Sequence, residues 1–335
     1  MKPLRVLFFG TPSFAVPTLD ALLASPDAVV VGAVTQPDKP RGRGQQVSAS
    51  PIKARAESAG LPVLQPTKLA DGNFLEAARA LGPDLGVVAA YGRLLPEVVL
   101  ALPRLGLVNV HASLLPRWRG ASPIERAIMD GDRETGVTIM RVVKALDAGA
   151  MLAVARTPID PDETGEALEA RLSEIGASLL VSTLPALADG SIRDVPQDEA
   201  LVTLAPRIAK TDGLIDWDAP ARAVHDTVRA LVPWPRAYTF LEALRLIVHE
   251  TRPHASLAAA WAATGGIGRE PAGLVAQAGV VAPSPKGTLL VGAGEGSVIE
   301  IRRLQEDGRR VLEARAFLAG RPLPAGTAFT TQASA

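Results

Sequence analysis

The first 110 residues alternate short, continuously apolar runs with helix-like stretches, and few folds accommodate this pattern. The apolar runs lie at 4–10, 28–34, 85–90 and 105–110. The helix-like stretches lie at 14–23, 51–60, 71–82 and 94–102. A strand that is apolar along its whole length is buried on both faces, as in a parallel sheet covered by helices. The pattern therefore predicts an α/β fold built on a doubly wound, mostly parallel sheet.

The first strand–helix junction does not fit the usual dinucleotide site. Such a site needs the glycine pattern G-x-G-x-x-G, which lets backbone amides approach a pyrophosphate. Here the junction reads Gly10-Thr-Pro-Ser-Phe14 and contains one glycine, and no G-x-x-x-x-G-K-[ST] motif occurs in the chain. We therefore expect neither a nicotinamide cofactor in the usual place nor a Walker-type nucleotide site.

The pattern changes in the C-terminal part of the chain. Residues 191–207 are rich in Asp, Pro and Arg without periodicity, which indicates a linker. Beyond them lie one helix-like stretch at 224–231 and several short strand-like runs separated by Gly and Pro, which predict a small barrel or sandwich. An Ala- and Gly-rich segment at 253–272 is typical of a surface insertion. We expect domains at 1–190 and 208–330.

Composition narrows the possible functions. The chain has no cysteine and 4 histidines, which excludes disulfides and thiol chemistry and disfavours a metal site. Lys and Arg total 35 and so do Asp and Glu, so a polyanion would have to bind at local patches. No apolar run reaches the roughly 18 residues of a membrane span. We expect a cytoplasmic protein that does not bind membranes.

The densest cluster of polar residues follows the run 105–110 and extends from Asn109 to Gly120. In an open α/β sheet, ligands bind beyond the carboxyl ends of the strands. Asn109 and His111 are two positions apart, so on a strand they face the same side. The alternative is a strand-end histidine bonded to nearby backbone beside a turn asparagine. The pair alone does not decide between the two.

A second polar position is Asp147, in the turn between the strand-like run 136–143 and the apolar run 150–155. A carboxylate there could accept a hydrogen bond from a histidine and favour its charged form. An ordinary turn aspartate is the alternative.

The loop 36–45 is basic and rich in Gly and Pro. It carries Lys39, Arg41 and Arg43 against one acidic residue, Asp38. This charge favours contact with phosphate groups, and a solvated loop without a partner is the alternative.

Taken together, these elements resemble the methionyl-tRNA formyltransferases, a family of folate-dependent formyltransferases. The resemblance covers nearly the whole chain. Its segments are Phe9-Gly-Thr-Pro12, Thr35-Gln-Pro-Asp-Lys-Pro40, Ala90-Tyr-Gly92, Asn109–Gly120, Gly136-Val-Thr-Ile-Met140, Leu146-Asp-Ala-Gly149, Ile215-Asp-Trp217 and Pro233-Trp-Pro235. The run from Asn109 is similar to that of folate-dependent formyltransferases in general, whereas the basic loop and the C-terminal segments resemble the tRNA enzymes.

The resemblance implies a fold and a set of site residues. It implies a Rossmann-like formyltransferase catalytic domain, followed by an OB-like β-barrel that helps to bind tRNA. By the same resemblance, the catalytic residues are Asn109, His111 and Asp147. The residues implied to bind folate are Ser113, Leu114, Leu115 and Pro116. The residue implied to contact the acceptor end of the tRNA is Arg43, and the charge of the same loop adds Lys39 and Arg41 to the expected tRNA contacts.

The implied reaction transfers the formyl group of 10-formyltetrahydrofolate to the α-amino group of initiator methionyl-tRNA, for translation initiation. The substrate supplies the nucleophile, so the enzyme has to stabilise an oxyanion and move protons. Asn109 would donate to the oxyanion, His111 would donate and shuttle a proton, and Asp147 would orient His111. We expect a monomer that uses the folate as co-substrate and binds no metal.

Two other functions stay open at this point. The chain could formylate another amine, such as a nucleotide sugar or a purine precursor. It could also be a non-catalytic module that binds folate or RNA. The joint presence of Asn109, His111 and Asp147 disfavours the module, since binding alone does not need all three.

Overall fold

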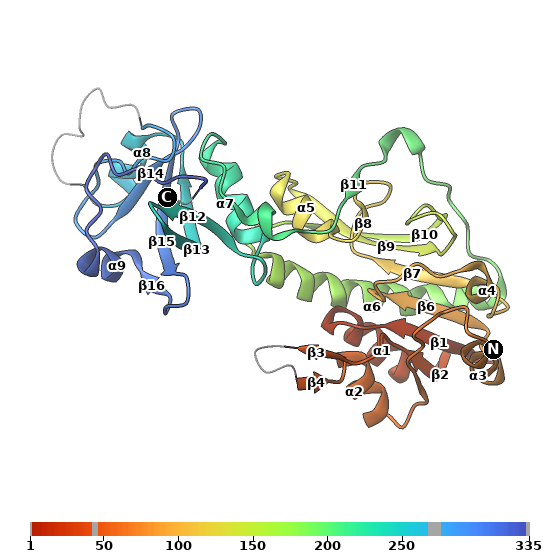
Figure 1. The fold of residues 1–335 in the computed structure, drawn as a ribbon. Helices are drawn as coiled ribbons and strands as arrows, with labels where there is room; N and C mark the ends of the chain where they lie inside the picture. The colour runs from red at the N-terminus through yellow and green to blue at the C-terminus, as the bar shows by residue number, and fades with distance from the viewer. Residues whose placement is uncertain (1, 42–45, 267–275, 333–335) are drawn as a thin grey trace. The chain divides into compact units, whose positions relative to one another are not determined.

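The computed structural model describes residues 2–41, 46–266 and 276–332, which form two compact units (Figure 1). The N-terminal unit comprises residues 1–123, 134–159 and 167–206. The C-terminal unit comprises residues 124–133, 160–166 and 207–335. Among the helices of the described ranges, none is both long and apolar enough to cross a membrane.

A seven-stranded sheet in the order β10-β9-β7-β6-β1-β2-β5 organises the N-terminal unit. Its parallel strands are β1 (Leu4–Gly10), β2 (Ala28–Val34), β5 (Val63–Leu64), β6 (Leu85–Ala89) and β7 (Leu107–His111). Two antiparallel strands, β9 (Glu134–Arg141) and β10 (Met151–Pro158), complete one edge. The chain moves outward from β1 first in one direction and then in the other, so the sheet is doubly wound. This confirms the predicted fold class.

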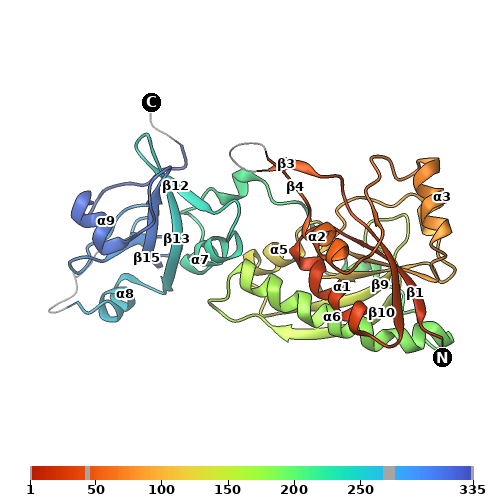
Figure 2. The same cartoon turned by 90° about the horizontal axis from the view of Figure 1, so that it is seen from below.

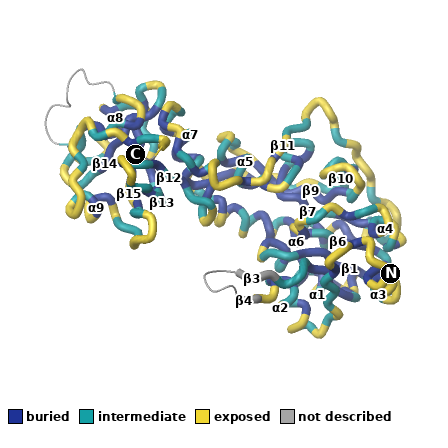
Figure 3. Tube along the Cα trace, in the orientation of Figure 1, coloured by how far each residue is buried: buried dark blue, intermediate teal, exposed yellow. Residues whose placement is uncertain are grey.

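Helices cover both faces of this sheet. They are η1 (Ser13–Ala15), α1 (Val16–Ala24), α2 (Pro51–Ser58), α3 (Gly72–Ala80), α4 (Glu97–Leu100) and α6 (Gly165–Asp189). On one face, Leu7 and Phe9 of β1 pack in a buried cluster with residues of α3 and α4. On the other face, Gly176 of α6 lies so close to β7 that a Cβ there would meet Val110 at 2.6 Å. Helices α1 and α6 lie side by side in both views, and the central strands are mostly buried (Figures 2 and 3).

Capping residues determine where two of these helices begin. Ser50 precedes α2 and its Oγ accepts from the Lys53 amide at 3.1 Å, with Pro51 at the first helical position. Asp71 precedes α3 and accepts from the Phe74 amide at 3.2 Å. Such caps satisfy backbone donors that have no partner within the helix.

The C-terminal unit is built on a five-stranded antiparallel sheet. Its strands are β12 (Ala237–Leu241), β13 (Leu244–His254), β15 (Val298–Glu306) and β14 (Leu289–Gly292) in that order, with β16 (Leu312–Glu313) paired to β15. Its helices are η3 (Lys210–Gly213), α7 (Ala221–Ala230), α8 (Leu257–Ala263), α9 (Ala314–Gly320) and most of α5 (Pro123–Met129). Trp217 stacks on Phe329 at 5.8 Å in its core. The sequence predicts a small β domain after the parallel sheet, and the structure shows that its sheet is antiparallel.

Part of the segment predicted to be a surface insertion, 253–272, is regular structure. Strand β13 continues to His254, and α8 follows from Leu257 to Ala263. The alanines that suggested low complexity are strong helix formers, and Ser256 caps the helix by accepting from the Ala259 amide. Residues 267–272 lie outside the described residues.

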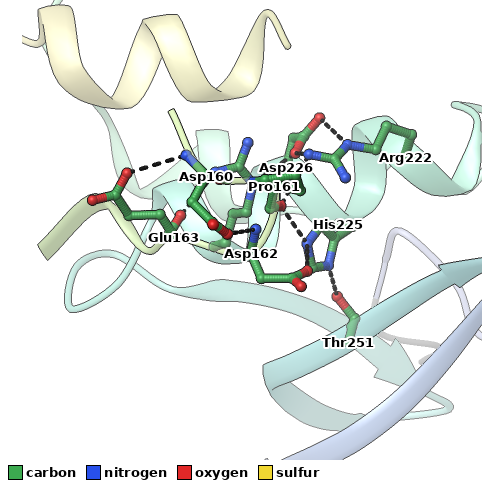
Figure 4. A network of polar contacts seen from close by, with 9 residues as sticks. Asp160, Pro161, Asp162, Glu163, Arg222, His225, Asp226 and Thr251 are labelled. Atoms are coloured by element: carbon green, nitrogen blue, oxygen red, sulfur yellow. Dashed lines mark hydrogen bonds and ion pairs between the residues drawn. The ribbon is translucent and has the colours of Figure 1, made fainter. Parts of the chain in front are cut away.

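A buried ionic network holds residues 160–166 against α7 within the C-terminal unit (Figure 4). The Asp226 carboxylate accepts from Arg229 Nε at 2.7 Å and from Arg222 Nε at 3.0 Å. Arg229 Nη1 donates to the Glu163 carbonyl at 2.8 Å. Asp226 and Arg229 are almost fully buried, and either charge would be costly to bury without the other.

Candidate active site

The site begins at the carboxyl end of β7, where Asn109 and His111 lie on the same side of the strand. Asn109 is paired with Met140 and His111 with Thr138 on the neighbouring strand β9. His111 is 5% exposed, whereas Asn109 is partly exposed. The amide of the Asn109 side chain has no hydrogen-bond partner among the described residues. It is therefore available to a ligand.

Each ring nitrogen of His111 has one neighbour. Nε2 lies 3.0 Å from the Trp118 carbonyl, and Nδ1 lies 3.8 Å from Asp147 Oδ2. A carbonyl only accepts, so the first contact assigns a proton to Nε2. Nδ1 then faces the Asp147 carboxylate at a distance longer than a direct hydrogen bond.

Asp147 lies in the turn between β9 and β10, in the left-handed region with φ of 44°. Its Oδ2 also accepts from the Gly120 amide at 3.0 Å, and the side chain is 17% exposed. Two residues on, a Cβ at Gly149 would lie 1.9 Å from the Arg141 carbonyl oxygen, so the turn requires glycine there. Backbone conformations of this kind persist where surrounding contacts enforce them.

The loop after β7 is held by hydrogen bonds to Thr138 on β9 and by one hydrogen bond within the loop. Thr138 Oγ1 donates to the Ser113 carbonyl at 2.7 Å and accepts from the Leu115 amide at 3.2 Å. Ser113 Oγ donates to the Arg117 carbonyl at 2.6 Å. Leu114 and Pro116 are partly exposed, whereas Leu115 is buried. The loop therefore presents two apolar side chains from a braced backbone, and its serine hydroxyl is engaged within the loop.

The ends of β1 and β6 close the neighbouring part of the sheet. The Tyr91 carbonyl accepts from Thr11 Oγ1 at 3.2 Å and from Gln36 Nε2 at 2.8 Å. Tyr91 itself is 1% exposed and meets Phe9 edge to face at 5.7 Å. Burial raises the pKa of the Tyr91 hydroxyl above its ordinary value.

Comparison with known proteins places this geometry in a family. A family model described as "Formyl transferase" matches residues 4–184, and one described as "Formyl transferase, C-terminal domain" matches residues 207–322. The chain is 43% identical over 332 residues to the methionyl-tRNA formyltransferase of Desulfotalea psychrophila, covering 98% of this chain and 97% of that protein. The chain belongs to the methionyl-tRNA formyltransferase family. The resemblance stated from sequence motifs is confirmed.

A second member of the family, from Myxococcus xanthus, is 45% identical over 96% of this chain and 97% of its own length. Among solved structures, an N-formyltransferase from Helicobacter canadensis in complex with folinic acid and dTDP-3-aminofucose superposes with a TM-score of 0.64. Its identity is 15%, covering 90% of this chain and 99% of that one. HypX from Aquifex aeolicus, in complex with tetrahydrofolic acid, has a TM-score of 0.57 at 17% identity, covering 94% and 47%. These two likenesses show the fold.

The basic loop expected from the family resemblance is described only in part. Lys39 and Arg41 lie on β3 (Lys39–Arg41), which forms a hairpin with β4 (Gln46–Ser48), and Arg43 lies outside the described residues. The single acidic residue, Asp38, pairs with Lys53 and accepts from Gln65 Nε2 at 2.8 Å. The hydrogen bond from Lys53 lowers the pKa of Asp38. The partners of this carboxylate, Lys53 and Gln65, both lie outside the loop 36–45.

Sequence reasoning missed several residues that touch the site. Thr203 Oγ1 accepts from the Trp118 amide at 2.9 Å. Gln197 Nε2 donates to the carbonyls of Asp147 and Gly149, at 2.8 Å each. Both residues lie in 191–207, where the absence of periodicity predicted only a linker. Across the ranges that the structure describes, no cluster of three or more His, Asp and Glu side chains is placed to hold a metal ion.

Proposed function

We propose that the chain transfers the formyl group of 10-formyltetrahydrofolate to the α-amino group of initiator methionyl-tRNA. The observation that carries the proposal is the grouping of His111 and Asp147 beside the free amide of Asn109, at the carboxyl end of β7. The family's members are named for this substrate and match the chain over nearly its full length. The solved structures with folinic acid and tetrahydrofolic acid share its fold.

The proposed mechanism uses the three side chains in separate roles. The bound folate supplies an activated formyl group. Asn109 donates to the oxygen of that group as negative charge develops on it, an interaction whose loss typically costs about 10²–10³ in rate. Nε2 of His111 is engaged by Trp118, so Nδ1 is the ring atom able to exchange a proton. As the amine nitrogen bonds to the formyl carbon, its proton passes to Asp147, whose carboxylate also stabilises the imidazolium of His111. The bond between the formyl carbon and N10 of the folate then breaks, and N10 takes a proton from His111, so that tetrahydrofolate leaves. Asp147 returns its proton to His111.

The loop after β7 supports the proposed folate site. Its backbone is braced by Thr138, and it exposes the apolar side chains of Leu114 and Pro116. We propose that Ser113, Leu114, Leu115 and Pro116 line the folate. Because the Ser113 hydroxyl is bonded within the loop, we assign it to shaping the wall.

For the tRNA, we propose contacts from the basic loop and from the C-terminal unit. Lys39, Arg41 and Arg43 would bind phosphates near the acceptor end. In residues 208–330, Tyr238 and Phe240 of β12 are partly exposed, and Arg245 lies over the Tyr238 ring at 4.0 Å. Exposed aromatic and cationic side chains suit the bases and phosphates of RNA.

The proposed activity also bears on location and assembly. Aminoacylated tRNA and reduced folate meet in the cytoplasm, and we propose that the protein works there. The three catalytic side chains come from one chain, so the proposed site needs no second copy.

The test is incubation of the purified chain with 10-formyltetrahydrofolate and initiator methionyl-tRNA, with formation of N-formylmethionyl-tRNA as the readout. A nucleotide-sugar amine and a purine-precursor amine serve as parallel substrates. We expect a formylated product with the methionyl-tRNA and none with either of the other two amines. Formylation of either other amine without formylation of the tRNA would reject the proposal.

A further inference from the structure

Residues 194–205, which we call the strap, run along the turn that carries Asp147 and the loop that follows His111. Val195 exchanges backbone hydrogen bonds with Met151, at 2.8 and 2.9 Å. At the other end, β11 (Leu204–Ala205) pairs with β8 (Arg119–Gly120). The strap therefore fastens the turn before β10 and the loop after β7 to one segment.

Gln197 is unusual within the strap because its side chain turns inward. All nine residues of 193–201 are described, and Gln197 alone among them is not exposed. Its Nε2 donates to the carbonyls of Asp147 and Gly149, and its Oε1 accepts from Arg119 Nε at 2.9 Å. One amide thus uses both of its donor hydrogens on the turn that presents the Asp147 carboxylate.

This turn needs support from outside. Asp147 is held at φ of 44°, a left-handed conformation that is strained for a residue with a side chain. The carbonyl of the same residue is one of the two that Gln197 binds. Losing the two donors would free the turn to relax and move the carboxylate relative to His111.

The strap also reaches the partner of His111. Thr203 Oγ1 accepts from the amide of Trp118, whose carbonyl binds His111 Nε2 at 3.0 Å. Arg119 next to it is 7% exposed and donates to both Gln197 and Glu199. The anchors of Asp147 and His111 are therefore linked through the strap and not only through the sheet.

We propose that Gln197 is a positioning residue for the Asp147–His111 pair. It contacts neither Asn109 nor the loop 113–116 by any hydrogen bond of the described structure, and it acts on the pair through the backbone of the Asp147 turn. The proposal rests on the proposed function only for its kinetic readout.

The sharpest variant is Gln197→Glu, which keeps the size of the side chain and replaces its two donor hydrogens with an acceptor. We expect kcat to fall roughly 10–100-fold, since a displacement of about 1 Å can cost about 100-fold. The KM values for folate and tRNA should change less than threefold, and the melting temperature little. Gln277→Glu makes the same charge change at an exposed glutamine of the C-terminal unit and should leave kcat unchanged.

Coupling to Asp147 separates positioning from a general effect on structure. If Gln197 acts through Asp147, Gln197→Glu should have little further effect on kcat in an Asp147→Asn background. Fully multiplicative losses, a rise in KM at unchanged kcat, or normal kcat in Gln197→Glu would each overturn the proposal. If Gln197→Glu does not fold, Gln197→Met offers the same comparison without the added charge.

A second readout does not depend on activity. The chain has 4 histidines, so the ring resonances of His111 can be assigned by NMR and compared between the wild type and Gln197→Glu. We expect a shift at His111 and none at His225. Unchanged His111 resonances would overturn the positioning role, whereas a wild type that formylates no tRNA would overturn the proposed function alone.

Discussion

At the scale of single residues, the chemistry depends on which atoms His111 has left to use. The Trp118 carbonyl engages Nε2, and Asp147 stands 3.8 Å from Nδ1, longer than a hydrogen bond. Asp147 is meanwhile held in place by the Gly120 amide and by the bonds of its own backbone to Gln197.

Asp147→Asn tests this arrangement. The change preserves shape but removes the charge that stabilises protonated His111, so we expect kcat to fall by about 10²–10⁴-fold. Steady-state formylation kinetics are the measurement, with the unfolding transition checked in parallel. Asp20→Asn, at a half-exposed aspartate paired with Arg55, is the matched control. Near-normal turnover in folded Asp147→Asn would remove Asp147 from the mechanism.

At the scale of elements, polar residues connect segments that the hydrophobic cores do not. The network around Asp226 binds residues 160–166 to α7 (Figure 4). Its Arg229 is 4% exposed. The strap likewise joins the turn of Asp147 to the loop after β7, through Gln197 and Thr203. In both cases, side chains satisfy backbone carbonyls in segments that lack regular partners.

Asp226→Asn should destabilise the C-terminal unit. The variant leaves the buried guanidinium of Arg229 without its countercharge, and breaking such a pair typically costs about 3–5 kcal/mol. Urea unfolding monitored by tryptophan fluorescence gives the change in the free energy of unfolding. Arg222→Gln removes the half-exposed partner of the same carboxylate and should cost no more than about 1 kcal/mol. Equal effects of the two changes would contradict this account of the network.

Arg43→Ala tests the hairpin loop as a phosphate-binding element. We expect a higher KM for methionyl-tRNA, a salt dependence of tRNA binding that is weaker by about one unit of slope, and unchanged folate binding. Kinetics at two salt concentrations and a folate titration provide the measurement. Arg104→Ala, whose side chain is 67% exposed in the same unit, is the control. Loss of folate affinity with normal tRNA kinetics would assign the loop to the wrong ligand.

At the scale of the whole molecule, basic and acidic residues are equal in number, and burial shifts the pKa values of His225 and Glu125. Burial lowers the pKa of His225 below its ordinary value of 6.5, and Arg222 and Arg229 act in the same direction while Asp226 opposes them. Asp162 also lies near the ring, at 3.2 Å from Nε2. Burial raises the pKa of the Glu125 carboxyl. This residue therefore makes the free energy of unfolding increase as pH falls, whereas His225 makes it decrease.

The lowered pKa of His225 predicts a loss of stability in mild acid. Below about pH 6.5 the unfolded chain binds a proton at this residue before the folded chain does, so the free energy of unfolding decreases as pH falls through that window. Urea unfolding at pH 7.5 and 5.5 measures the decrease. The difference between the wild type and His225→Gln isolates this residue from Glu125. An identical pH dependence in both proteins would contradict the prediction.

Sequence patterns alone were enough to locate four of the N-terminal strands along the chain and to place Asn109 and His111 on one side of β7. Apolar runs and two-residue spacing are local properties, since a strand alternates its side chains whatever it packs against. They therefore indicated that Asn109 and His111 share a face. They also indicated a small β domain after the parallel sheet, whereas the roles of the site residues stay predictions.

Only the tertiary structure decided what holds those residues in place. The hydrogen bond from Trp118 to Thr203 joins positions 85 apart, and that from Gln197 to Asp147 joins positions 50 apart. No periodicity records such contacts, because they form between irregular segments after the sheet has brought the chain together. For the same reason the segment 191–207 reads as a linker in the sequence, although in the folded chain its middle braces the turn of Asp147.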